Sequence, residues 1–209
     1  MSMKMMKKAM IGTAGAVAMF SASATFAQTP ANSDPNAWEV LQEFNGSGYT
    51  SITSGSYTFS GPTELSAGIG ADCNLELTGT VEIDVPNNYV TITVTDGEVN
   101  AGQLICNSLD VRNFPWVAYA DASSGAPANI PGSQSPSSAT ADDNVSGNIR
   151  GIDVTLFGST ICTGAIDFVF NNGSPVSNVS YFDFDGPIVG TGSCTVDGTL
   201  SANTDVNAY

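Results

Sequence analysis

The chain has 209 residues, of which 42% are hydrophobic, enough apolar side chains for the core of one folded domain. It contains 5 Lys and Arg against 20 Asp and Glu and no histidine, for a formal net charge of −15. This balance argues against nucleic-acid binding, which needs clustered basic residues. The lack of histidine excludes Ser-His-Asp triads, Cys-His dyads and His-ligated zinc.

Residues 1–27 have the three parts of a bacterial-type secretory signal peptide. Three lysines near the start precede an apolar run over Ala9–Phe20, and small residues then lead to Ala27. The apolar run is shorter than the roughly 20 residues that a transmembrane helix needs. We therefore expect cleavage before Gln28, with Ala24 as the alternative last residue of the signal. The mature chain is expected to be secreted, extracellular or associated with the cell surface, and to have no transmembrane segment.

Removal of the signal peptide makes the chain more acidic. Residues 28–209 keep two arginines against 20 acidic residues, a net charge of −18. Calcium is the metal that such acids suggest, but neither Asp142-Asp143-Asn144 nor Asp183-Phe184-Asp185-Gly186 fits a calcium-binding loop. We expect no metal ion and no other cofactor.

The mature chain is predicted to be all-β. Apolar and polar side chains alternate over Cys73–Val85, with a bend expected at Gly79, and again over Tyr89–Val99, after a turn at residues 86–88. Similar alternation is found at residues 152–156, 166–170 and 194–200. Helical periodicity is limited to a short stretch at residues 37–44. The predicted fold is an antiparallel β-sandwich or barrel-like domain.

Residues 120–147 differ from the rest because they are almost exclusively Ser, Ala, Gly, Pro, Asp and Asn. This composition has no apolar face to bury, so we expect a long mobile loop or linker. It divides residues 28–209 into two halves. We interpret them as one β domain, because the second half is short for an autonomous sandwich.

Four cysteines are expected to form two structural disulfides in an exported chain: Cys73, Cys106, Cys162 and Cys194. They allow three connectivities. The pairs Cys73–Cys106 and Cys162–Cys194 are favoured because each closes a loop of similar length within one half of the chain. The spacings contain no Cys-x-x-Cys pair of the kind that binds zinc.

Without histidine, and without lysine in the mature chain, paired carboxylates are the most natural catalytic groups, as in glycoside hydrolases. Glu76, Glu82 and Asp84 share one face of a predicted strand. Alternate acids on a strand are, however, typical of the solvated face of an antiparallel sheet. Trp116, which a sugar site would use for stacking, is expected in the core beside Phe114. We therefore expect no catalytic residues and no enzyme activity, with a two-carboxylate hydrolase as the least favoured alternative.

An aromatic stretch near the C-terminus offers a candidate binding surface. Tyr181, Phe182 and Phe184 are interrupted and followed by the acids Asp183 and Asp185. If these aromatic side chains are exposed, they form an apolar surface patch rimmed by acids, which marks an interface. The alternative is a central strand that is covered on both faces.

Short motifs accompany each cysteine. They are Cys73-Asn74-Leu75-x-Leu77-x-Gly79, Cys106 with Pro115-Trp116, Cys162 with Asn171-Asn172, and Cys194-Thr195-Val196-x-Gly198-Thr199-Leu200. Over residues 60–201 the chain thereby resembles the alkane-oxidation protein activator family. The resemblance implies a small secreted bacterial protein with an accessory role at the hydrocarbon surface, and it supplies no catalytic residues.

The resemblance favours a surface-active protein whose partner is an apolar hydrocarbon or a cell-surface component. The alternative is an extracellular matrix (biofilm) or adhesin-like module that binds a glycan or a protein. The sequence does not fix the oligomeric state.

Overall fold

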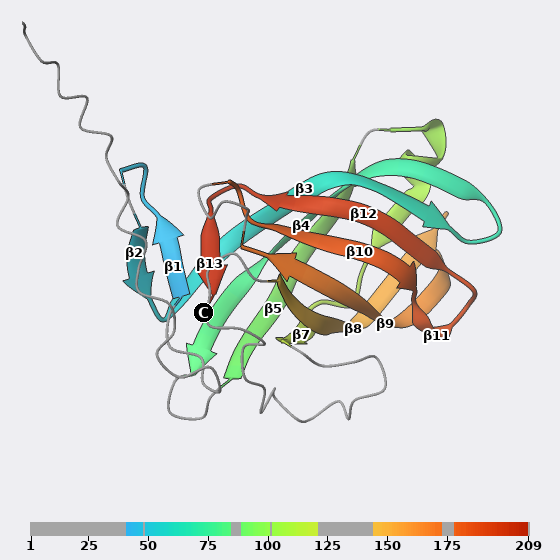
Figure 1. Cartoon of the computed structure of the whole chain (residues 1–209). Coiled ribbons are helices and arrows are strands. Elements are labelled where there is room, and N and C mark those ends of the chain that lie inside the picture. Colours follow the sequence, from blue (N-terminus) through green and yellow to red (C-terminus); the bar gives the residue numbers. More distant parts are fainter. Residues whose placement is uncertain are drawn as a thin grey trace, which may run out of the picture.

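The structure, a computed structural model, describes residues 41–47, 49–84, 89–100, 102–120, 144–172 and 178–208. The expected signal peptide and its cleavage point lie outside the described residues, as does most of the expected loop at residues 120–147. In the described segments the regular structure is antiparallel β, apart from one short 3₁₀ turn (Figure 1). These segments include no helix that is long and apolar enough to cross a membrane.

Within the described segments, eight strands close into an antiparallel barrel in the order β9-β10-β12-β3-β4-β5-β7-β8, and β8 pairs back with β9. Their bounds are β3 Ser54–Ser66, β4 Gly70–Asp84, β5 Tyr89–Asn100, β7 Trp116–Ala120, β8 Asn144–Leu156, β9 Ser159–Asn171, β10 Tyr181–Pro187 and β12 Thr195–Ala202. Two short strands add to this sheet: β6 (Leu109–Val111) pairs with β8, and β11 (Val189–Thr191) pairs with β9. The prediction of an antiparallel, barrel-like β fold is confirmed.

A small second sheet lies beside one end of the barrel (Figure 1). It contains β1 (Leu41–Phe44), β2 (Tyr49–Ile52) and β13 (Val206–Ala208) in the order β13-β1-β2. The helical periodicity at residues 37–44 was misleading, because the described part of that stretch is the strand β1.

Tyr57 connects this small sheet to the barrel. Its phenol hydroxyl donates a hydrogen bond of 3.0 Å to Oε2 of Glu43 on β1, while its ring is buried in the barrel. Burial raises the pKa of the Tyr57 phenol well above its usual range, and the hydrogen bond and negative charge of Glu43 raise it further.

The hydrophobic core fills the barrel, because alternate side chains of each strand point inward. On β10, Phe182 and Phe184 are buried, whereas Asp183 and Asp185 are exposed. The Phe182 ring centroid lies 4.7 Å from that of Phe59 on the facing wall. The predicted apolar surface patch of Tyr181, Phe182 and Phe184 is therefore wrong: two of its members are core residues, only 5% and 4% exposed, and Tyr181 is half-buried.

The strands on either side of the sequence at 120–147 are neighbours in the barrel. Ala120 is the last residue of β7 and pairs with Gly147 on β8, which begins at Asn144. The two halves of the sequence also meet where β12, which follows residues 120–147, pairs with β3, which precedes them. Strands from both halves of the sequence thus contribute to one closed sheet and share one core.

Candidate functional site

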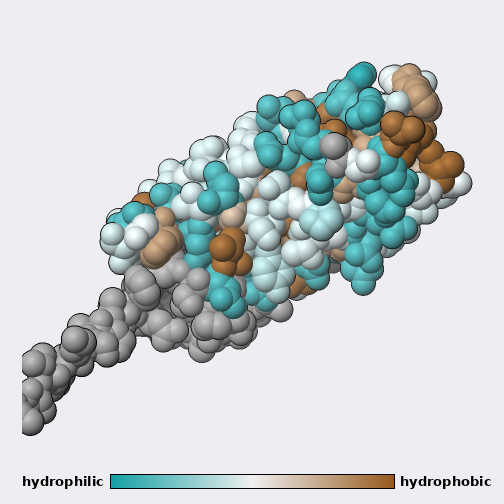
Figure 2. Space-filling model, turned by 90° about the horizontal axis from the view of Figure 1, so that it is seen from above, coloured by the Kyte–Doolittle hydropathy of each residue, from teal (hydrophilic) through white to brown (hydrophobic). Residues whose placement is uncertain are grey.

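One end of the barrel carries four exposed apolar side chains, three on connections between strands and one at the start of β11. They are Ile69 between β3 and β4, Leu104 after β5, Phe157 between β8 and β9, and Val189 after β10, with exposed fractions of 46%, 90%, 75% and 52%. We call these four residues the apolar tip. Figure 2 shows hydrophobic surface gathered at this end of the molecule, at the upper right of the view. Val179, which is 48% exposed, precedes β10 at the opposite end.

Leu104 is held in place by a disulfide and by backbone hydrogen bonds. It is the first residue of the 3₁₀ turn η2 (Leu104–Ser108), and Cys106 in this turn is bridged to Cys73 on β4 with the two Cα atoms 5.6 Å apart. The backbone N–H of Gln103 also donates to the carbonyl oxygen of Asp72 at 3.1 Å. These links fix a turn that has little regular structure of its own.

Phe157 occupies a position that the hairpin geometry does not favour. Leu156 pairs with Ser159, so Phe157 and Gly158 form the two-residue turn between β8 and β9. Both have positive φ, +50° and +76°, as in a type I′ turn. An aromatic residue rarely adopts this conformation, which asparagine and glycine tolerate best. The backbone N–H of Phe157 donates to the carbonyl oxygen of Ser108 at 2.8 Å, which places this turn beside the end of η2.

The second disulfide strengthens the other side of the same end. Cys162 on β9 is bridged to Cys194, which directly precedes β12, with the two Cα atoms 6.2 Å apart. The backbone N–H of Ile188 donates to the carbonyl oxygen of Cys194 at 2.8 Å. This arrangement buries Ile188 and leaves its neighbour Val189 at the surface. The structure thus pairs the four cysteines as the sequence favoured, with both bridges at the end that carries the apolar tip.

The charged groups near the tip are mostly acidic. Asp72 is exposed and accepts a hydrogen bond of 2.6 Å from the side-chain amide of Gln103. Arg112, one of the two arginines beyond residue 27, forms an ion pair of 2.6 Å with Asp110 on β6. Because this positive charge is paired with Asp110, it leaves the negative charge of Asp72 uncompensated.

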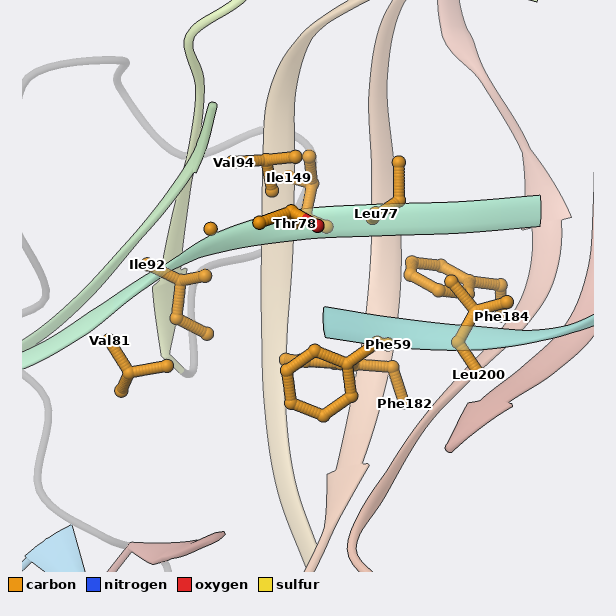
Figure 3. Close-up of a pocket in the computed structure, with 11 residues that line it drawn as sticks. Phe59, Leu77, Thr78, Val81, Ile92, Val94, Ile149, Phe182, Phe184 and Leu200 are labelled. Carbon is orange, nitrogen blue, oxygen red and sulfur yellow. The ribbon is translucent and has the colours of Figure 1, made fainter. Parts of the chain in front are cut away.

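Three small cavities lie inside the described part of the barrel. Their volumes are about 20, 50 and 60 Å³. Their walls follow β4 in steps: Leu77 and Val81 line the first, Leu75 and Leu77 the second, and Cys73 and Leu75 the third. We call them the cavity row, and it runs along the barrel toward the apolar tip. Figure 3 shows the first cavity, with aromatic and aliphatic side chains from several strands around it.

The cavity row offers few polar groups to a water molecule. The polar side-chain groups in its walls, apart from the disulfide, are the hydroxyls of Thr63 and Thr78 and the indole N–H of Trp116. All three are hydrogen-bonded: Thr63 to Gly61 at 3.3 Å, Thr78 to Thr58 at 2.9 Å, and Trp116 to Arg112 at 2.8 Å. Since a buried water needs two to four polar partners, these spaces favour an apolar occupant. At about 24 cal/mol per Å³, the largest cavity costs the fold about 1.4 kcal/mol when empty.

The carboxylates proposed for the hydrolase alternative lie on β4, the strand that the cavity row follows. Glu82 is exposed and Glu76 is half-buried on the outer face, where Glu76 is opposite Glu98 on β5. Neither lines a cavity of the row. Trp116 is 3% exposed and stacks on Phe114, so its predicted place in the core is confirmed. In the described segments, no group of three or more Cys, Asp or Glu residues is arranged to hold a metal ion.

The apolar tip and the cavity row were both missed by the sequence reasoning. An apolar residue within a turn, such as Phe157 before Gly158, was the available signal for the tip. The cavities have no signal in the sequence, because their walls use the same alternating aliphatic residues as a filled core.

The comparisons with known proteins give one match. The model of the family described as alkane oxidation protein activator PraA/PraB-like matches residues 47–208. This range includes the whole barrel and all of the apolar tip. No curated protein and no solved structure matches the chain.

Proposed function

The chain belongs to the alkane oxidation protein activator PraA/PraB-like family, and we propose that it is a secreted, non-catalytic accessory protein that attaches to hydrocarbon surfaces. The apolar tip carries this proposal. It presents four large apolar side chains at one end of a rigid barrel, and two of them, Leu104 and Phe157, are 90% and 75% exposed. The family description indicates the class of substrate, and the apolar tip is the surface that we propose contacts the hydrocarbon.

The energy available at the tip is sufficient for adsorption. Transfer of an exposed Leu or Phe side chain from water into an apolar phase gains about 1.5–3 kcal/mol. Leu104 and Phe157 together therefore contribute about 3–6 kcal/mol before Ile69 and Val189 are considered. Since the Cys73–Cys106 disulfide already fixes the turn that begins at Leu104, and Phe157 lies in a two-residue hairpin turn, adsorption costs little conformational entropy.

Export of the protein is part of the proposal. Two disulfides suit an oxidising compartment, and residues 1–27 have the pattern of a signal peptide. The intact mass of protein collected from the medium or the cell surface is expected to correspond to a chain that begins at Gln28. A mass that includes Lys4, Lys7 and Lys8 would contradict this expectation.

Interfacial tension between hexadecane and buffer tests the function directly. Purified protein is expected to lower the tension, and a variant with Leu104→Ser and Phe157→Ser is expected to lower it much less. The control is Val179→Ser, which removes an apolar side chain that is 48% exposed from the opposite end of the barrel and should behave as the unaltered protein.

Two outcomes would count against the proposal. No fall in tension with the unaltered protein would exclude surface activity and favour the matrix or adhesin alternative. Equal activity of the tip variant and the control would show that the protein adsorbs through another surface.

A further inference from the structure

We propose that the cavity row inside the barrel binds a single linear hydrocarbon chain. This inference rests on the proposed function for the class of ligand. It adds a site within the protein, where one molecule is enclosed, that is separate from adsorption at the apolar tip.

Neighbouring cavities of the row are separated by single layers of side chains. The first and second cavities share three lining residues: Leu77, Ile149 and Phe184. The second and third share four: Leu75, Val111, Val154 and Val196. Changes in the rotamers of these few side chains would join the cavities into one continuous space.

The shape and chemistry of the row favour a linear, wholly apolar ligand. From Val81 to Cys73 the row follows β4 over about 27 Å, at about 3.4 Å per residue, whereas its cavities are no larger than 60 Å³ each. Once rotamer changes join the three cavities, the resulting space is long and narrow, a shape that favours an unbranched chain over a ring system. The two hydroxyls in these walls, those of Thr63 and Thr78, are already hydrogen-bonded within the protein, which disfavours a polar head group. The interior of an eight-stranded barrel is of the size that holds one small ligand.

The third cavity connects this site to the apolar tip. Its walls include Cys73, which is bridged to the turn that begins at Leu104, and Leu109, which directly follows this turn. Leu65 and Val196, which also line it, are only half-buried. A hydrocarbon chain at the tip therefore has the shortest path into the barrel through the third cavity.

Retention of n-decane by the purified protein tests the inference. The protein is equilibrated with n-decane or with decalin, a bicyclic hydrocarbon with the same number of carbons. It is then separated by gel filtration, and the bound hydrocarbon is measured by gas chromatography. We expect about one n-decane per chain and much less decalin.

Two variants alter the cavities in opposite directions. Val154→Phe fills the wall shared by the second and third cavities and is expected to weaken n-decane binding about tenfold, which corresponds to about 1.4 kcal/mol. Leu75→Ala enlarges the same two cavities and is expected to retain n-decane at least as well as the unaltered protein and to admit decalin. The variant with Leu104→Ser and Phe157→Ser should still bind n-decane at equilibrium, because the site lies inside the barrel.

The outcomes separate this inference from the proposed function. If the unaltered protein retains no n-decane but still lowers interfacial tension, the internal site is wrong and surface adsorption remains. If it retains n-decane without lowering the tension, the internal site remains and surface adsorption is wrong. Loss of n-decane in the tip variant, or equal retention by Val154→Phe, would place the bound hydrocarbon outside the cavity row. If Val154→Phe does not fold, the test depends on Leu75→Ala. If Leu75→Ala retains no more decalin than the unaltered protein does, the inference is wrong.

Discussion

Replacing Phe182 with alanine should destabilise the barrel and leave adsorption to hexadecane unchanged. Phe182 is 5% exposed, and its ring centroid lies 4.7 Å from that of Phe59 and 5.0 Å from those of Phe168 and Phe170. Truncation of a buried aromatic side chain in such a cluster costs about 3–5 kcal/mol. In a domain of this size each kcal/mol lowers Tm by about 2–4 °C, so Tm should fall by about 6–20 °C.

Thermal unfolding followed by circular dichroism measures this change, and Phe157→Ala is the matched control. Phe157 undergoes the same substitution but is 75% exposed. Its replacement should shift Tm by no more than about 2 °C, because surface substitutions stay within about 0.5 kcal/mol. Adsorption should show the reverse order: at temperatures where both variants are folded, only Phe157→Ala should weaken it. If Phe182→Ala has the same Tm as the unaltered protein and loses surface activity, the assignment of core and tip is wrong.

Replacing both Cys73 and Cys106 with serine should lower the free energy of unfolding by about 3–4 kcal/mol in the chain-entropy model, since the bridge closes a separation of 33 residues; a urea titration that shows no loss would contradict this. Stability should fall as the pH rises above about 10, where tyrosine ionises in the unfolded chain but the raised pKa keeps Tyr57 protonated in the fold. This alkaline loss should be smaller in Tyr57→Phe, and identical pH profiles would contradict the role of burial and Glu43. Hexadecane emulsions made with the protein should coarsen as salt rises, because the Debye length shrinks from about 30 Å at 0.01 M to about 3 Å at 1 M; droplet sizes that do not change with salt would show that charge repulsion is not what separates the droplets.

The local strand pattern could be predicted from the sequence because it depends on neighbouring residues alone. The alternation at Cys73–Val85 and Tyr89–Val99 corresponds to β4 and β5, which pair with each other. The bend expected at Gly79 is a shift in register between Thr78 and Gly79. A side chain at Gly79 would lie 2.5 Å from the carbonyl oxygen of Thr93, so the close approach of the two strands requires glycine there.

The closure of the sheet and the direction of its faces could not be predicted in this way. Strand β3 has few large apolar residues and gave no clear alternation, although it pairs with both β4 and β12. Phe182 and Phe184 are two residues apart, so they lie on the same face of β10. Whether that face is covered depends on Phe59 and Phe168, which come from distant parts of the chain. Phe182 and Phe184 alternate with the acids Asp183 and Asp185, and this pattern indicated that both rings face inward. The patch hypothesis gave this pattern too little weight.

The bridge between Cys73 and Cys106 is where the two proposed sites meet. Cys73 lines the third cavity, and Cys106 lies in the turn that begins with Leu104. One covalent bond therefore positions both an exposed apolar side chain and a wall of the internal space. If hydrocarbon passes from the tip into the barrel, loss of this bridge should change interfacial tension and n-decane retention together, whereas Leu104→Ser should slow uptake without changing the amount bound at equilibrium. If the two sites are independent, Leu104→Ser should leave the rate of uptake unaltered, so a time course of n-decane uptake distinguishes the two arrangements.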